Sequence, residues 1–391
     1  MKALHTRRRR TSVVATAVAA VSLLGACGTG SGQQGPPPAP AAAVDQPVVV
    51  THDGGLTVLD GTNLKVAAEL PLAGFNRVNA AGDDRHVIVS TAAGFQVLDA
   101  VAARLTDITF PGAKPGHVVR HAGKTVLFTD GTGEVTVFDP RTLGDGPPQT
   151  TRYTAAEPHH GVAVELVDGT LVTTLGNAET RRGILVLDRN RTEIARNEEC
   201  PGVHGEAAAQ GEAVVVGCEN GVLIYRDGTI TKVVSPTPYG RIGNQSGSDT
   251  SPITLGDYKQ DENAELERPT TISLVDTVTA GVKLVDIGTS YTFRSLARGP
   301  QAEGLVLGTD GQIHVIDPVA GTVVRRIPVI GAWQEPLEWQ QPRPAIFVRG
   351  STAYVSDPAQ KQLHAVDLAT GAKTATATLR VAPNELSGVT G

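Results

Sequence analysis

The feature that most constrains the fold is a short motif that recurs along the chain. A turn residue leads into three or four alternating apolar residues, and the run ends at Asp or, once, at Arg. Successive copies start 38 to 50 residues apart, and one four-stranded blade of a β-propeller takes about 40 to 50 residues. The eight copies are Gly55–Asp60, Gly94–Asp99, Glu134–Asp139, Gly183–Asp188, Gly221–Arg226, Thr271–Asp276, Gln312–Asp317 and Gln362–Asp367.

Each copy has strand-like neighbours on both sides. A run such as His86–Thr91 precedes the motif and a run such as Thr322–Pro328 follows it, so the motif is predicted to be the third strand of a meander. A weaker strand of small residues comes before these three and fits the innermost position of a blade. Seven such strands are expected at Phe75–Ala80, His117–His121, His160–Leu166, Val203–Ala209, Arg241–Gln245, Thr292–Ala297 and Arg343–Val348.

The first blade lacks an inner strand of its own, because Val48–His52 is already its predicted second strand. Val381–Thr390, after the last outer strand, can fill that position and close the ring. We therefore predict an all-β fold, an eight-bladed propeller over residues 47–391. Seven blades are the alternative if the irregular stretch Gly240–Arg268 does not build a full blade.

The composition agrees with a propeller and excludes some functions. The chain has 44 glycines, 25 prolines and only 19% charged residues, unlike a helical bundle. Its formal net charge of −6 leaves no basic surface for binding phosphates, so nucleic acid is not expected as a partner.

The N-terminus has the organisation of an export signal. Five cations within the first ten residues precede an uncharged run from Thr11 to Leu24, and Leu24-Gly25-Ala26-Cys27 follows. These four residues resemble the bacterial lipobox, so residues 1–26 are predicted to be a lipoprotein signal peptide and Cys27 the lipidated first residue. An ordinary signal peptide with an incidental cysteine is the alternative.

The predicted mature chain starts with a linker and is strongly acidic. Residues 27–46 are rich in Pro, Gly and Ala, which is typical of a spacer between a membrane anchor and a folded domain. Subtracting the five leader cations from 34 Lys plus Arg leaves 29 against 40 Asp plus Glu, a charge near −11. We expect a monomer that is lipid-anchored on the extracytoplasmic face of the cell membrane.

Two further cysteines, Cys200 and Cys218, remain after Cys27 is assigned to the lipid. Export places them in an oxidising compartment, so a disulfide between them is predicted. Two buried thiols are the alternative.

The histidines are distributed unevenly. Five of the ten lie in three consecutive inner-strand segments, at His117, His121, His159, His160 and His204. The inner strands converge on the axis of a propeller, so residues at their starts meet at one mouth of the channel. Since side chains alternate along a strand, His204 and Glu206 are expected on one side and His159 and His160 on opposite sides.

This arrangement predicts a metal site of His117, His160, His204 and Glu206, with His159 kept as an alternative ligand or supporting residue. His160 is preferred because a Pro-x-His pattern aligns it with His117. Three imidazoles and a carboxylate suit tetrahedral Zn²⁺. The alternative is that these histidines bind backbone groups and hold loops at the channel mouth.

At these residues the chain resembles the AztD-type zinc metallochaperones, which accompany bacterial ABC zinc importers. The segments that carry the resemblance are Pro115–Arg120, Asp130–Pro140, Pro158–Val164, Cys200–Glu206 and Cys218–Val222. The resemblance implies a protein that binds zinc outside the cytoplasm and passes it to the importer's solute-binding protein without catalysis. Family members carry a His- and Asp-rich N-terminal segment, but Gly28–Ala43 contains neither residue, so a docking or capture role of that segment is not carried over. Family members also tend to have a histidine beside the tryptophan that precedes blade 8, where this chain has Ala332-Trp333, and Thr292–Ala297 lacks one too, so a second metal site is not predicted.

Two other functions are consistent with the same residues. One is a lipoprotein that binds a peptide, glycan or protein partner, with structural histidines and no tight zinc. The other is a hydrolase or lyase that uses zinc-bound water, since three protein ligands leave a fourth position open. Zinc binding and turnover of simple esters distinguish the three.

Overall fold

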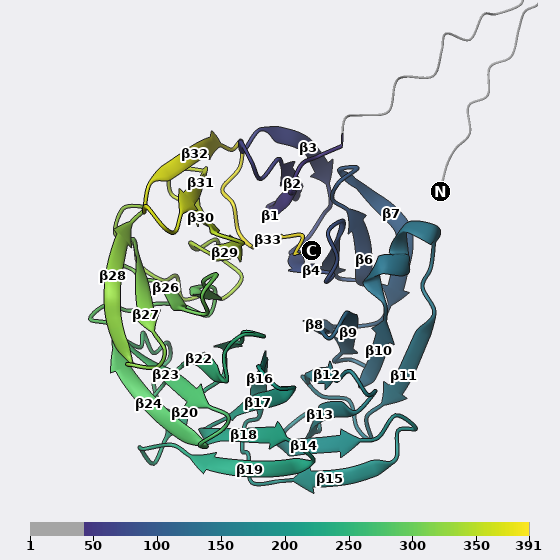
Figure 1. The fold of residues 1–391 in the computed structure, drawn as a ribbon. Helices are drawn as coiled ribbons and strands as arrows, with labels where there is room; N and C mark the ends of the chain where they lie inside the picture. Colours follow the sequence, from purple (N-terminus) through teal and green to yellow (C-terminus); the bar gives the residue numbers. More distant parts are fainter. Residues whose placement is uncertain (1–42, 391) are drawn as a thin grey trace, which may run out of the picture. The chain divides into compact units, whose positions relative to one another are not determined.

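The computed structural model describes residues 43–390, so the predicted signal peptide, Cys27 and nearly all of the predicted linker lie outside the described residues. The described chain forms eight sheets arranged as the blades of a propeller (Figure 1). Each blade is a four-stranded antiparallel meander, and in blade 5 a short fifth strand pairs in parallel with the third. The prediction of eight blades is confirmed. Within residues 43–390, no helix is long and apolar enough to cross a lipid bilayer.

The first four blades follow one another along the chain, and each runs outwards from the axis; blade 1 starts at its second strand, because the C-terminal strand supplies its innermost one. Blade 1 contains β1 (Val48–His52), β2 (Gly55–Leu59) and β3 (Val66–Pro71). Blade 2 contains β4 (Arg77–Ala80), β5 (His86–Thr91), β6 (Gly94–Asp99) and β7 (Arg104–Pro111). Blade 3 contains β8 (Pro115–His121), β9 (Lys124–Thr129), β10 (Glu134–Phe138), the 3-10 helix η1 (Pro140–Asp145) and β11 (Thr150–Thr154). Blade 4 contains β12 (Ala163–Glu165), β13 (Leu171–Gly176), β14 (Arg181–Leu187) and β15 (Glu193–Asn197).

The remaining blades repeat this order. Blade 5 contains β16 (His204–Ala209), β17 (Ala213–Cys218), β18 (Asn220–Arg226) and β19 (Thr229–Val234), with β20 (Gly240–Arg241) paired to β18. Blade 6 contains β21 (Gln245–Ser246), β22 (Ile253–Asp257), β23 (Thr271–Asp276) and β24 (Gly281–Asp286). Blade 7 contains β25 (Leu296–Arg298), β26 (Gly304–Leu307), β27 (Gln312–Asp317) and β28 (Thr322–Pro328). Blade 8 contains β29 (Ile346–Arg349), β30 (Thr352–Asp357), β31 (Gln362–Asp367) and β32 (Lys373–Thr378).

The ring is closed by the C-terminal strand β33 (Leu386–Gly388), as predicted. It pairs antiparallel with β1, with Val48 opposite Gly388 and Val50 opposite Leu386. Next to this pairing, the Glu385 carboxylate accepts from Arg77 of blade 2 at 2.8 Å and from Arg294, ahead of β25, at 3.0 Å. The closing segment is therefore fixed to blade 1 by backbone bonds and to two other blades by ion pairs.

The hydrophobic core is divided among the contacts between neighbouring blades. Second and third strands such as β5 and β6 are almost wholly buried, because each face packs against an adjacent sheet. Outer strands such as β7 alternate between exposed and partly buried residues, since only one face is covered. This explains why the repeated motif, which forms the third strand, was the clearest signal in the sequence.

Several predicted inner strands differ from those observed. His160 lies three residues before β12, which starts only at Ala163. In blade 6, the predicted Arg241–Gln245 strand is replaced by β20 and the two-residue β21. In blade 7, β25 starts at Leu296 rather than at Thr292, and in blade 8, β29 starts at Ile346 rather than at Arg343. In blades 4, 7 and 8, residues outside the strand thus occupy the start of the predicted strand.

Candidate metal centre

Three of the predicted ligands lie together at one end of the propeller. His117, His160 and His204 each offer a ring nitrogen, and these nitrogens all lie within 4.8 Å of one another. The ring centroids are 4.9 to 5.3 Å apart. The three residues come from blades 3, 4 and 5, so the group exists only because three blades are packed side by side.

Irregular backbone aims two of these histidines. The ladder between β8 and β9 has a bulge between Pro115 and Val118, which includes His117. The ladder between β16 and β17 has one between His204 and Glu206. Bulges of this kind re-aim side chains and are frequent beside functional sites.

Glycines next to the histidines permit these contacts. Gly205 has φ +72°, and a Cβ there would lie 2.4 Å from the Gly243 carbonyl oxygen. A Cβ at Gly116 would lie 2.1 Å from Oδ1 of Asp130. Larger residues at either position would displace groups that hold the histidines, because both gaps are far below a van der Waals contact.

Hydrogen bonds fix the orientation of His204. Its Nδ1 lies 2.6 Å from the Gly243 carbonyl oxygen, which can only accept, so Nδ1 carries the hydrogen. Burial, followed by the proximity of His117, holds the pKa of His204 well below its usual range. The ring is therefore neutral at neutral pH, and Nε2 presents a lone pair to the centre of the group.

His160 completes the pair of facing nitrogens. Its Nε2 lies 2.9 Å from Nε2 of His204, and its Nδ1 lies 2.5 Å from Oδ2 of Asp130. The contact with the Asp130 carboxylate fixes the orientation of the His160 ring, and Nε2 of His160 faces the centre of the group.

The arrangement fits a tetrahedral ion with little movement. Metal–nitrogen bonds of about 2.0 to 2.1 Å place neighbouring ligand nitrogens about 3.3 Å apart, against the observed 2.9 Å between the two Nε2 atoms. Opening this contact by a few tenths of an ångström would admit the ion. The side chain of His160 is 42% exposed and that of His117 is 19% exposed, so the group is reached from the side of His160.

The structure places the other two predicted site residues differently. Glu206 is not part of the three-histidine group; its carboxylate lies 3.2 Å from Nδ1 of His117. His159 is buried, and its ring nitrogens pair with the Glu157 carbonyl and the Thr174 hydroxyl, both at 2.9 Å. His159 thus points away from the group that His160 joins.

Sequence reasoning missed Asp130 and Gly243. Asp130 comes directly after β9, which places it at the end of the blade where the histidines lie. Carboxylates that hold the second nitrogen of a ligand histidine fix its tautomer and raise its basicity. Gly243 contributes only its carbonyl, for which the sequence has no signal.

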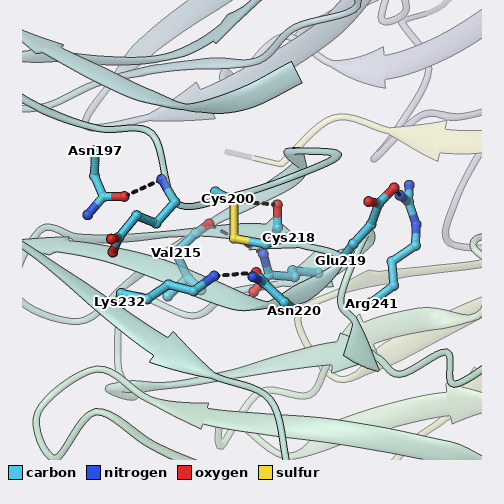
Figure 2. Close-up of a disulfide and its surroundings, with 11 residues drawn as sticks. Asn197, Cys200, Val215, Cys218, Glu219, Asn220, Lys232 and Arg241 are labelled. Atoms are coloured by element: carbon cyan, nitrogen blue, oxygen red, sulfur yellow. Dashed lines mark hydrogen bonds and ion pairs between the residues drawn. A yellow bond between two sulfur atoms is a disulfide. The ribbon is translucent and has the colours of Figure 1, made fainter. Parts of the chain in front are cut away.

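The predicted disulfide is present and adjoins the site. Cys200 and Cys218 are joined by a disulfide bond (Figure 2). Cys200 lies four residues before His204, and Cys218 is the last residue of the neighbouring strand β17. Figure 2 also shows Glu219 beside Arg241, with a closest approach of 3.6 Å. The Arg241 guanidinium lies over Gly243, and a Cβ on Gly243 would be 3.0 Å from Nε of Arg241. The segment bearing His204 is therefore held to β17 by a covalent bond.

Comparison with known proteins agrees with this fold and with the resemblance seen in the motifs. The chain is 25% identical to the zinc chaperone AztD of Citrobacter koseri over 305 residues, which are 75% of this chain and 70% of that protein. The structure of apo AztD from Citrobacter koseri matches with a TM-score of 0.77 and 21% identity, covering 88% of this chain and 96% of that one. No protein-family model matches the chain.

A more distant likeness shows that the fold alone does not determine function. Dihydro-heme d1 dehydrogenase NirN matches with a TM-score of 0.61 and 15% identity, covering 90% of this chain and 77% of that one. One propeller architecture can host unrelated activities. A function for this chain has to be argued from the site.

Proposed function

We propose that this protein is a zinc metallochaperone that binds one Zn²⁺ through His117, His160 and His204 and delivers it to the solute-binding protein of an ABC zinc importer. The observation that carries the proposal is the pair of Nε2 atoms of His160 and His204, which face each other at 2.9 Å while their Nδ1 atoms are bound elsewhere. The similarity to a zinc chaperone supports it.

The surroundings of the histidines suit a divalent cargo. Two carboxylates, Asp130 and Glu206, stand behind His160 and His117 and offset part of the ion's charge. Neutral imidazoles without a thiolate are borderline donors, which favours zinc over copper(I). Glu206 remains a candidate fourth ligand, since a small rotation would carry it from Nδ1 of His117 towards the ion.

Delivery requires that ligands be exchanged one at a time with the recipient. His160 is the most accessible of the three ligands, so we propose that it is the first to leave the ion. His204 is the most firmly held, through Gly243, and would leave last. The protein performs no chemical reaction in this scheme, and we propose that it is not an enzyme.

Its place in the cell follows from the N-terminal sequence. We propose that Cys27 is lipidated and that the propeller acts as a monomer on the extracytoplasmic face of the membrane, tethered by residues 27–46. Labelling with a radioactive fatty acid, lost on Cys27→Ser, tests the anchor. Label that persists in this variant would contradict the assignment.

The decisive experiment compares two routes of zinc loss. Purified residues 43–390 should contain about one zinc, and mixing with the apo solute-binding protein should move that zinc faster than a chelator of equal affinity removes it. Equal rates would indicate passive release and would leave zinc storage as the function. Absence of tight zinc would favour the peptide- or glycan-binding alternative, and hydrolysis of simple esters would favour an enzyme.

A further inference from the structure

A hollow separate from the histidine group opens at the same end of the propeller. It has a volume of about 180 Å³ and lies between three loops, one after β22, one before β25 and one before β29. The histidine group also lies where inner strands begin and second strands end, which is the end that these loops share. The volume equals that of about six water molecules, which suits one long side chain.

The walls of this hollow are apolar and its rim is exposed. Leu266, Phe293, Leu337 and Trp339 contribute to the lining. Leu337 is 61% exposed and Trp339 51% exposed. The Trp339 ring packs edge-on against Phe75, with ring centroids 5.1 Å apart. Such a rim is available to a partner approaching this end of the ring.

The floor carries a buried acid with one oxygen unoccupied. Asp257 is 6% exposed and lines the hollow. Its Oδ1 accepts the N–H groups of Gly243 at 2.7 Å and Asn244 at 3.0 Å. Within residues 43–390, Oδ2 has no hydrogen-bond donor. An oxygen of this kind, deep in an apolar pocket, is suited to a charged donor.

The lining of the hollow carries three acids and two cations, Arg343 and Lys259. Glu335 pairs with Arg343 at 2.6 Å, while Glu267 accepts the backbone N–H groups of the adjacent loop. Burial raises the pKa of both Asp257 and Glu335. Lys259 and Arg241 oppose this rise at Asp257, and Arg343, Lys259 and Arg268 oppose it at Glu335.

One peptide unit, between Gly243 and Asn244, connects this floor to the metal centre. Its N–H, on Asn244, donates to Oδ1 of Asp257, and its carbonyl, on Gly243, accepts from Nδ1 of His204. A cation at Oδ2 would draw negative charge away from Oδ1 and so weaken the bond to Asn244. Occupation of the hollow is thereby transmitted to a ligand histidine.

We infer that this hollow receives one lysine or arginine side chain of the protein that takes the zinc, and that docking is thereby sensed at His204. The inference rests on the proposed function. The aliphatic stem would lie along Leu266 and Leu337, and the cationic head would reach Asp257 past the aromatic rings. The acidic loop at the rim, Asp261–Glu267, favours a basic partner over an acidic one.

The pocket is tested first without zinc and without the partner. The peptide acetyl-Gly-Lys-Gly-amide is titrated into zinc-free protein labelled with 5-fluorotryptophan, and Trp333→Phe assigns the two fluorine signals. A saturable shift of the Trp339 signal is expected with lysine and not with norleucine in its place. Asp257→Asn should abolish the shift, whereas Asp286→Asn, an exposed acid of the same blade, should not. Equal shifts with both peptides would overturn the inference.

The partner is then tested directly. Zinc transfer to the apo solute-binding protein should slow at least tenfold in Trp339→Ala and Asp257→Asn, while removal by chelator stays near the wild-type rate in Trp339→Ala. The exposed Trp339 keeps the test valid if Asp257→Asn does not fold. Unchanged transfer in Trp339→Ala would overturn the inference and leave the chaperone function standing. If the protein bound the lysine peptide but no zinc, the proposed function would be rejected, and the assignment of the hollow as a lysine-binding pocket would still stand.

Discussion

Replacing Asp130 by Asn tests whether a carboxylate that acts through His160, without binding the metal itself, sets the zinc affinity. The change keeps the size of the side chain and removes its charge. Asn would also place an NH₂ group opposite Nδ1 of His160, which favours a hydrogen on Nε2, the nitrogen that faces the metal. Both effects lower affinity for zinc.

The size of the loss can be estimated from the geometry. The 2.5 Å hydrogen bond, the width of the ring and a metal bond of about 2.0 Å place the ion roughly 6 to 7 Å from Oδ2 of Asp130. A charge of +2 and a charge of −1 at that distance attract by about 1.3 kcal/mol in bulk water, and by about four times as much at an effective dielectric of 20. The 42% exposure of His160 places the real value towards the lower figure. We expect affinity to fall between about tenfold and a hundredfold, the range known for such supporting residues.

The assay is competition with a chromophoric zinc chelator at fixed pH. Glu193→Gln, which removes an acid on the outer strand β15, controls for net charge. In a His160→Ala background, Asp130→Asn should have little further effect, because its partner is already absent. An affinity within about twofold of wild type in Asp130→Asn would refute the argument, as would full additivity of the two substitutions.

Three further outcomes are expected. His204→Ala should lower zinc affinity by roughly tenfold or more, whereas His159→Ala should lower the urea midpoint and leave zinc affinity unchanged; the opposite pattern would exchange their roles. Replacing Cys200 and Cys218 by Ala should cost about 3 kcal/mol of unfolding free energy for an 18-residue loop and weaken zinc binding, and an unchanged urea midpoint and affinity would contradict this. Because the pKa of His204 is lowered on folding, the unfolded chain binds more protons, so the zinc-free domain should lose stability as pH falls from about 6.5 towards that lowered pKa.

The repeat was legible in the sequence because it reflects local hairpins. Strands such as β6 and β27 follow their own turns and need only apolar alternation to be recognised. The two-residue β21 was not predicted correctly, because a strand that short carries no periodic pattern. Its place in blade 6 depends on pairing with β22, which is a tertiary property.

The site was predictable to the extent that it depends on chain position. Three inner-strand histidines in consecutive blades had to converge, and His117, His160 and His204 do. The prediction that Glu206 and His204 point to the same side assumed that side chains alternate along a regular strand. The bulge between these two residues breaks the alternation, so the prediction does not apply. The role of Asp130 could not be derived, because it depends on how blade 4 packs against blade 3.

The pairing of β33 with β1 determines when the molecule can finish folding. Thr51 and Glu385 bond although 334 residues separate them, so the edge of β1 stays unpaired until the last few residues have been made. Such distant pairing is slow, and an open edge of buried valines invites association with other chains in the interval. Loss of the final seven residues would make that interval permanent. Purification tags and fusions therefore belong ahead of residue 43 and not at the C-terminus.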